Sequence, residues 1–186
     1  LFRRALQFNP HSAEAHFNLG ALYGEHGNHE EAIREFRQAI RLSPDSVEAH
    51  YNLGIALYEQ GDLDAALDAF RRVARLNTNH ADANYFVGMI YFRKGLHAKS
   101  VKLLQGALKT NPDNPSILYH IGMCYNHLEQ PTKAIPPLKR VTELSPDDHR
   151  AFYALGMVYD RADMRDEARE ACELIMSGQA SEAQIG

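Results

Sequence analysis

The chain has 186 residues, of which 45% are apolar and 24% charged, with a formal net charge of −4. No apolar run approaches the ~20 residues that a membrane-spanning helix needs, and no lysine- or arginine-rich run suits a nucleic-acid backbone. We therefore expect a soluble protein without membrane insertion or a nucleic-acid partner, with the cytoplasm as the favoured compartment.

Glycine recurs at intervals of 34 residues along the chain, at Gly20, Gly54, Gly88, Gly122 and Gly156. A sequence with such a period folds as small stacked units and not around one closed core. Within residues 47–76, apolar side chains follow helical spacing, stop at Gly61 and Asp62, and then resume. Each unit is therefore predicted to be two helices joined by a short turn, with the periodic glycine allowing close approach of the two helices.

In chain order, a half unit at 1–12 precedes full units at 13–46, 47–80, 81–114, 115–148 and 149–178 and a polar tail at 179–186. In the fourth unit, Asn114 followed by Pro115 predicts a helix start, because asparagine caps a helix and proline is tolerated at its first position. Farther along, Pro136 and Pro137 remove backbone donors beyond the first turn of a helix that begins near Pro131. A kink or a delayed helix start is predicted there, in preference to a functional hinge.

Side chains around each glycine repeat in register. An aliphatic residue precedes the glycine, and around Gly54 the following pattern residues are Leu57, Ala66 and Phe70. Proline closes most units. This pattern resembles the tetratricopeptide repeat, L-G-x-x-Y, then A-x-x-x-F, then P. The resemblance implies an all-α protein, an α-solenoid of stacked antiparallel helix pairs that form a right-handed superhelix, and a role as a protein-protein interaction scaffold.

The resemblance also implies where a ligand binds, because the first helix of each repeat lines the concave groove in this family. The fifth position of each repeat gives Phe17, Tyr51, Tyr85, Tyr119 and Tyr153. The ninth gives Ala21, Ile55, Met89, Met123 and Met157. Asparagine at the sixth position, which bonds to the ligand main chain in peptide-binding relatives, occurs at Asn18 and Asn52. These rows suit an apolar or amphipathic peptide or helix segment, with packing as an open alternative for the tyrosines.

Charge along the groove changes sign between the early and the late repeats. The second and thirteenth positions are acidic at Glu14, Glu25, Glu48, Glu59 and Asp82, and basic at Arg93, His127, Arg150 and Arg161. Such a gradient orients an extended ligand and speeds its capture, whereas solvated charges without a partner are the alternative. The residues predicted to line the groove are Asn18, Tyr51, Asn52, Ile55, Tyr85, Met89, Tyr119, Met123, Tyr153, Met157, Arg150 and Arg161.

Neither catalysis nor cofactor binding is indicated. The sequence has no Gly-rich phosphate loop, no nucleophile motif and no i, i+4 histidine pair with a third ligand nearby, so we predict no enzyme activity, no cofactor and no metal. Cys124 and Cys172 fall on helical positions that face the interior and are both predicted to be buried free thiols. Similar repeats that grip the carboxyl terminus of chaperones carry lysine and asparagine where this chain has Phe17 and Ala21, which disfavours that partner.

Three classes of function stay open. A scaffold that binds a protein or peptide ligand is favoured; the alternative is a substrate-recruiting or regulatory arm of a larger enzyme such as a glycosyltransferase, and the third is an oligomer-forming structural array. The sequence begins inside a repeat with Phe2, Leu6 and Phe8, and Ile175 and Met176 lie near its end. We expect either further flanking repeats or weak self-association through uncapped ends.

Overall fold

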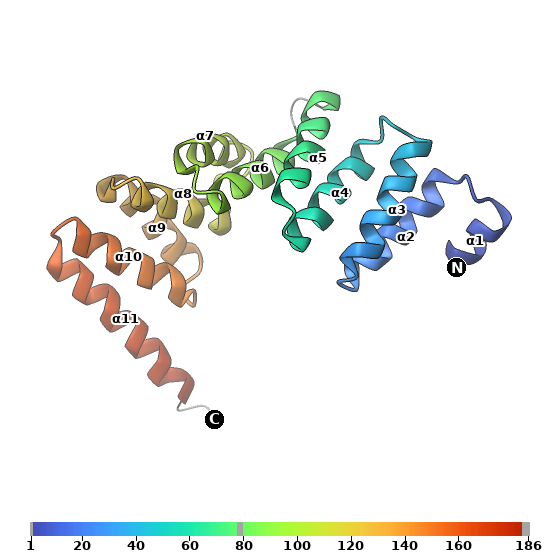
Figure 1. Ribbon diagram of the computed structural model, residues 1–186. Coiled ribbons are helices and arrows are strands. Elements are labelled where there is room, and N and C mark those ends of the chain that lie inside the picture. Colours follow the sequence, from blue (N-terminus) through green and yellow to red (C-terminus); the bar gives the residue numbers. More distant parts are fainter. Residues whose placement is uncertain (1, 78–79, 184–186) are drawn as a thin grey trace. The chain divides into compact units, whose positions relative to one another are not determined.

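The computed structural model describes the backbone of residues 2–77 and 80–183, and the side chains of these residues other than 3, 5, 81 and 175–183. Throughout these residues the regular elements are α-helices (Figure 1). They are α1 (Phe2–Phe8), α2 (Ala13–Glu25), α3 (His29–Leu42), α4 (Val47–Gln60), α5 (Leu63–Leu76), α6 (Ala81–Arg93), α7 (His97–Leu108), α8 (Pro115–His127), α9 (Pro131–Leu144), α10 (His149–Arg161) and α11 (Arg165–Ala183).

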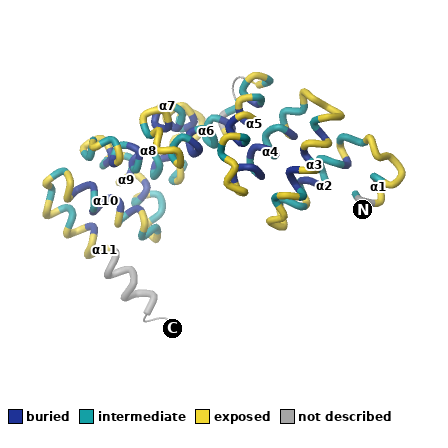
Figure 2. The backbone as a smooth tube through the Cα atoms, in the orientation of Figure 1, coloured by how far each residue is buried: buried dark blue, intermediate teal, exposed yellow. Residues whose placement is uncertain are grey.

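Helices that follow one another in the chain pack side by side. Within a repeat α2 contacts α3, α4 contacts α5, α8 contacts α9 and α10 contacts α11, while α3 with α4 and α9 with α10 join neighbouring repeats. In each half, the buried residues lie on the helix sides that face these neighbours (Figure 2). The prediction of an all-α solenoid of stacked helix pairs is therefore confirmed.

The chain divides into two compact halves, and each is described by itself. The amino-terminal half comprises Leu1–Ile90 and the carboxy-terminal half comprises Tyr91–Gly186, so the boundary falls within α6. In both halves, short polar side chains cap the N-termini of helices. Ser12, Ser46 and Asn114 each accept a hydrogen bond at 3.1 Å from the backbone N–H three residues later, which satisfies a donor that the helix itself cannot. The helix start predicted at Asn114 is confirmed.

The turns between the two helices of a repeat use a left-handed backbone residue. These residues recur every 34 positions, with φ of 72° at Gly27, 92° at Gly61, 72° at Gly95, 56° at Glu129 and 58° at Asp163. Glycine adopts this conformation freely, whereas a residue with a Cβ pays about 1–2 kcal/mol for it. The last two repeats therefore make the same turn at a higher conformational cost.

Inside the hairpins of the first, second and fourth full repeats, the periodic glycine faces the bulky residue that follows it sixteen positions later. A Cβ added at Gly54 would lie 2.8 Å from the ring of Phe70, and one at Gly122 would lie 2.5 Å from Cγ of Leu138. Phe70 and Leu138 are both completely buried. Real Cβ atoms do not make contacts this short, so the close approach predicted from the glycine period is present in these hairpins.

One prediction from the sequence is wrong, and one of two predicted alternatives is excluded. Cys172 is exposed, although Cys124 is buried as expected, because no described helix packs over this side of α11. Of the kink and the delayed helix start predicted near Pro136 and Pro137, the delayed start is excluded, since α9 begins at Pro131 and includes both prolines, and the kink stays a prediction. A helix accommodates them because tertiary packing overrides local propensity: Leu138 beside them is fully buried.

The predicted self-association depends on apolar side chains that are exposed at the two ends of the chain. Phe8 is 80% exposed, as an apolar end contact requires. Helix α11 continues to Ala183, into the predicted polar tail, and the side chains of Ile175 and Met176 lie outside the described ones. Association through the ends stays a prediction.

Candidate functional site

In the amino-terminal half, the first helices α2 and α4 contact each other, and two hollows open along the seam between them. We call the one near the helix N-termini the proximal hollow and the one near the C-termini the distal hollow. The proximal hollow, about 310 Å³, is lined by Ala13, Glu14, Phe17, Ala39, Ser43, Ser46 and Glu48. The distal hollow, about 210 Å³, is lined by Ala21, Gly24, Glu25, His29, Phe36, Asn52, Ile55, Ala56 and Glu59.

Each hollow has an apolar floor and a pair of carboxylates at its rim, one from each helix. In the distal hollow the floor includes Phe36 and Ile55, and the carboxylates belong to Glu25 and Glu59. Both glutamates are exposed, and among the described residues neither has a hydrogen-bond or ion-pair partner. Their charges are therefore available to a ligand.

The proximal hollow repeats this arrangement. Glu14 is exposed and has no partner within the described part of the chain, and Glu48 accepts only a long hydrogen bond of 3.5 Å from Ser46 Oγ. Phe17 forms part of the floor, with its ring centroid 5.9 Å from that of Phe36. Four glutamates thus occupy the rims of two separate hollows on one seam.

The arginines of this half lie outside the two helices that form the seam. Helices α2 and α4 contain no lysine or arginine, whereas α3 and α5 each contain three arginines. Several of these arginines bond to acids outside the seam, such as Arg34 to Glu31 at 2.9 Å and Arg72 to Asp45 at 2.7 Å. Among the side chains that the structure describes, no arginine of this half forms an ion pair with a rim carboxylate of the seam.

Among the predicted groove residues of this half, Asn18, Asn52 and Ile55 lie half-buried on the first helices, and the last two line the distal hollow. The Asn52 side-chain amide donates to the Glu48 carbonyl at 2.9 Å, which leaves its oxygen for another donor. Met89, by contrast, is only 9% exposed. It therefore packs inside the repeat and presents little surface to a ligand.

Tyr51 and Tyr85 belong to an aromatic cluster. The Tyr51 ring lies 5.9 Å from Phe70 and 6.0 Å from Phe86, and Tyr85 lies 5.3 Å from Phe86. Burial, together with the nearby Asp82, raises the pKa of Tyr51 to about 12, so its hydroxyl stays protonated at neutral pH. These contacts favour the packing interpretation for both tyrosines.

In the carboxy-terminal half, the two predicted arginines already have partners. Arg150 Nε and Nη2 donate to the Asp148 carboxylate at 3.0 Å, and these bonds hold the pKa of Asp148 below its usual range. Arg161 Nη1 donates at 2.8 Å to Oδ1 of the buried Asn126. The predicted basic end is therefore partly neutralised within the chain, a pairing that the sequence analysis missed.

The apolar groove residues predicted for this half differ in exposure. Tyr119 and Met123 are half-buried and pack on the core formed by residues such as Leu138 and Leu155, and Met157 is also half-buried. Tyr153 is 62% exposed. Of these four residues, Tyr153 exposes the largest fraction of its surface to a partner.

A histidine cluster, also missed by the sequence analysis, lies where α6, α7 and α8 meet in this half. The rings of His97 and His127 stack with centroids 4.4 Å apart, and Phe92 packs edge-on against both and against His120. Burial, with a smaller contribution from His127, lowers the pKa of His97, and burial also lowers that of His120. Across the described residues, no three metal-binding side chains are grouped to hold a metal ion.

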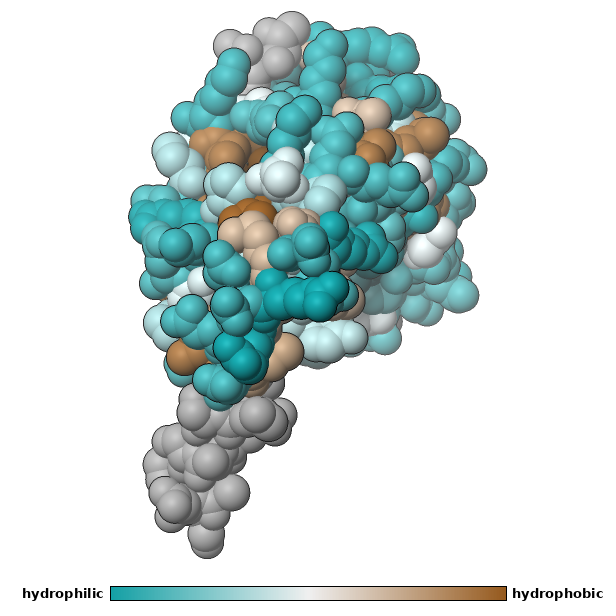
Figure 3. Space-filling model, turned by 90° about the vertical axis from the view of Figure 1, so that its left-hand side faces the viewer, coloured by the Kyte–Doolittle hydropathy of each residue, from teal (hydrophilic) through white to brown (hydrophobic). Residues whose placement is uncertain are grey.

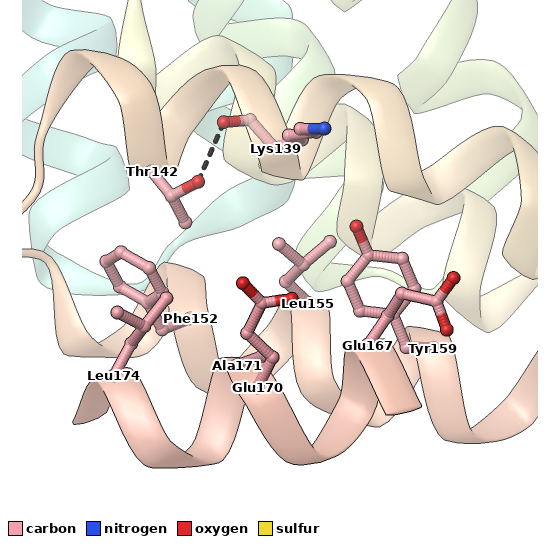
Figure 4. A pocket seen from close by; sticks show the side chains of 9 residues that line it. All are labelled: Lys139, Thr142, Phe152, Leu155, Tyr159, Glu167, Glu170, Ala171 and Leu174. Atoms are coloured by element: carbon pink, nitrogen blue, oxygen red, sulfur yellow. Dashed lines mark hydrogen bonds between the residues drawn. The ribbon is translucent and has the colours of Figure 1, made fainter. Parts of the chain in front are cut away.

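A third hollow, about 230 Å³, lies between α9, α10 and α11 (Figure 4). It is lined by Lys139, Thr142, Phe152, Leu155, Tyr159, Glu167, Glu170, Ala171 and Leu174. Leu174 is 50% exposed and occupies the same repeat position as Arg72 and Arg140. An apolar residue in place of a cation at this position is the sequence feature that could have indicated the hollow. On the face shown in Figure 3, apolar side chains lie in separate small areas among hydrophilic ones.

The stacked helix pairs and their 34-residue period define a helical repeat protein. Models of the tetratricopeptide repeat match residues 1–34, 21–81, 57–120 and 115–148. The chain belongs to the tetratricopeptide repeat family. No curated protein matches it. In the part of the chain that the structure describes, no helix is long and apolar enough to cross a membrane.

Solved structures of this family have a similar fold. A MamA from Desulfovibrio magneticus RS-1 is 26% identical with a TM-score of 0.87, covering 91% of this chain and 96% of its own. YrrB, described as a TPR protein with an unusual peptide-binding site, is 23% identical with a TM-score of 0.83 and coverages of 96% and 92%. The pilF protein of Pseudomonas aeruginosa is 18% identical, with a TM-score of 0.75 and coverages of 89% and 76%.

Proposed function

We propose that this chain is a protein-interaction scaffold that binds a peptide or helix segment of a partner on the first helices of its repeats. The observation that carries the proposal is the distal hollow between α2 and α4. Its lining includes Asn52 and Ile55, which the repeat positions alone had marked as ligand-facing. The hollow and the repeat positions are independent observations, and both support a role for Asn52 and Ile55 in ligand binding.

The lining suits a peptide better than a small metabolite. Ile55, Ala21 and Phe36 give an apolar floor for one side chain, and the free oxygen of the Asn52 amide is an acceptor for a main-chain N–H. The two hollows lie between the same pair of helices, so an extended ligand that follows the seam passes both. The peptide-binding site named for YrrB, a protein of similar fold, is consistent with this role.

A display experiment tests the proposal. The purified chain is immobilised and a random peptide library is enriched on it, and the enriched peptides are then titrated against variants. Ile55→Glu places a carboxylate on the apolar floor, where an apolar ligand side chain would have to bury it, so we expect the loss of most of the affinity.

Gln38→Glu is the matched control, because Gln38 is exposed on the second helix α3 and lines neither hollow of the seam. It introduces the same charge and leaves binding unchanged if the proposal holds. Failure to enrich any peptide, or equal affinity of the enriched peptides for Ile55→Glu and the wild type, contradicts the proposal, provided that circular dichroism shows both variants to be folded.

A further inference from the structure

We infer that the peptide bound by the amino-terminal half carries two cationic side chains about 16 Å apart, one for each hollow of the seam. This inference rests on the proposed function, since it names the chemistry of the ligand for the same surface. Its basis is the charge, the lining and the spacing of the proximal and distal hollows.

Each hollow is lined by one carboxylate from α2 and one from α4, and we assign one cation to each pair. Glu25 and Glu59 occupy the same repeat position on α2 and α4, and both line one hollow. An arginine guanidinium has five donors in a planar fork and can bond to both carboxylates at once, whereas an ammonium group acts as a point charge between them. Because neither glutamate has a partner among the described residues, ligand binding breaks no existing ion pair.

The floors of the hollows suit the rest of such a side chain. Phe17 in the proximal hollow and Ile55 in the distal hollow are half-buried apolar residues. Arginine and lysine bury their aliphatic stems on such surfaces while the charged group stays at the wet rim. A ligand side chain with an apolar stem and a cationic end therefore matches both parts of each hollow, and an acidic side chain matches neither.

The arrangement of charge around the seam strengthens this selectivity. Helices α2 and α4 carry four glutamates and no lysine or arginine, and the arginines of this half lie on α1, α3 and α5. A cationic peptide is attracted to the seam, and an acidic peptide is repelled from it, which discriminates between ligands beyond the direct contacts.

The spacing follows from helix geometry. Glu14 and Glu25 are eleven positions apart on α2, and so are Glu48 and Glu59 on α4. A rise of 1.5 Å per residue separates the two rims by about 16 Å. Between them lie Asn18 and Asn52, whose amides suit the exposed main chain of an extended ligand. An extended chain covers this distance in about five residues, so the two cations are about four to six positions apart.

Three synthetic peptides of the same length test the inference. One places two arginines about five positions apart in a background of alanine, serine and leucine; the second places the arginines side by side, and a third has glutamates for arginines. We expect the spaced peptide to bind at least about tenfold more tightly than the adjacent one, the glutamate peptide not to bind, and the affinity to fall with added salt.

Variants then assign the effect to the distal hollow. Glu25→Gln with Glu59→Gln removes one cation site and should bring the spaced peptide down to the affinity of the adjacent one. Glu30→Gln with Asp68→Asn makes the same change in net charge at exposed positions of α3 and α5 and should leave the tenfold difference in place.

Equal affinities of the spaced and adjacent peptides for the wild type, or unchanged binding to the Glu25→Gln, Glu59→Gln variant, overturn the inference. These failures are distinct from failure of the proposed function. If library-selected peptides without arginine or lysine bind in a manner that depends on Ile55, the scaffold proposal stands and the cationic ligand is wrong. If no peptide binds at this seam, both are wrong.

Discussion

A Cβ added at Gly54, in the amino-terminal half, would lie 2.8 Å from the ring of Phe70, whereas one added at Gly156, in the last repeat, would have Cys172 Sγ among its nearest neighbours at 3.7 Å. The charges differ as well: among the described residues the rim glutamates of the α2/α4 seam form no ion pair, while Arg150 bonds to Asp148 within its own half. One repeat register therefore produces the same backbone in both halves, but individual side chains decide how tightly a hairpin packs and which charges a partner can reach.

The largest effect on stability is expected when the side chain that faces each glycine is removed. Phe70 is completely buried and stacks on Phe86 at 5.1 Å, so Phe70→Ala leaves a cavity and should cost about 3–5 kcal/mol. Cys172→Ala, at the equivalent but exposed position, should change the free energy of unfolding by less than about 0.5 kcal/mol. Urea denaturation of the two variants measures both values, and similar losses would remove the contrast between the second and the last repeat.

A second test adds a methyl group to each glycine instead. Gly54→Ala forces the Phe70 ring to move and should destabilise the chain by about 1–3 kcal/mol. At Gly156 the new Cβ meets only ordinary contacts, so the better helix propensity of alanine should stabilise the chain by up to about 1 kcal/mol. The two substitutions are expected to shift the urea midpoint in opposite directions; shifts of the same sign would contradict the packing difference.

The turn residues give a third, smaller test. Gly61→Ala puts a Cβ on a residue with φ of 92° and should cost about 1 kcal/mol. Asp163 makes the equivalent turn with φ of 58°, so Asp163→Gly should relieve strain and raise the melting temperature. A lower melting temperature for Asp163→Gly would show that its side chain contributes more than the backbone strain costs.

The smallest expected effect is on the pH dependence of stability in the carboxy-terminal half. The pKa values of His97 and His120 are lowered, so below about pH 6.5 the unfolded chain binds protons that the folded histidines do not. Stability should therefore fall on acidification from pH 7 to pH 5, and hydrogen exchange should show this first in α7 and α8.

Replacing His97 by phenylalanine keeps a ring against His127 but removes one titrating group. We expect His97→Phe to flatten the pH dependence of exchange in α7 and α8, and His26→Phe in the other half to leave it unchanged. Increased protection of these helices at pH 5 would contradict the assigned direction of the pKa shifts.

The fold could be predicted from the sequence because its information is local and periodic. The interval between Gly20 and Gly54 and the cap at Asn114 each predict backbone geometry within one unit. The continuation of α9 through Pro136 and Pro137 could not be predicted in this way. Buried contacts with other helices outweigh the loss of two backbone N–H donors, and these contacts are not local in sequence.

The candidate site could be predicted only in part, for a related physical reason. Repeat position placed Asn52 and Ile55 on the seam, but it does not report what a side chain bonds to. The partners of Arg161 and of His97 come from a neighbouring repeat or helix, and their contacts depend on rotamers that spacing alone does not determine. Exposure of Cys172 likewise depends on whether another helix follows it.

The most direct test of the account is a methyl NMR titration of the whole chain with the peptide that carries two spaced arginines. Isoleucine, alanine and methionine methyl groups provide probes in both halves, among them Ile55 and Ala21 on the seam and Met157 on α10. The account predicts saturable shifts at Ile55 and Ala21 with none at Met157. Shifts at Met157 without shifts at Ile55, or no shifts at any of the three, would contradict the central claim that the α2/α4 seam is the binding surface.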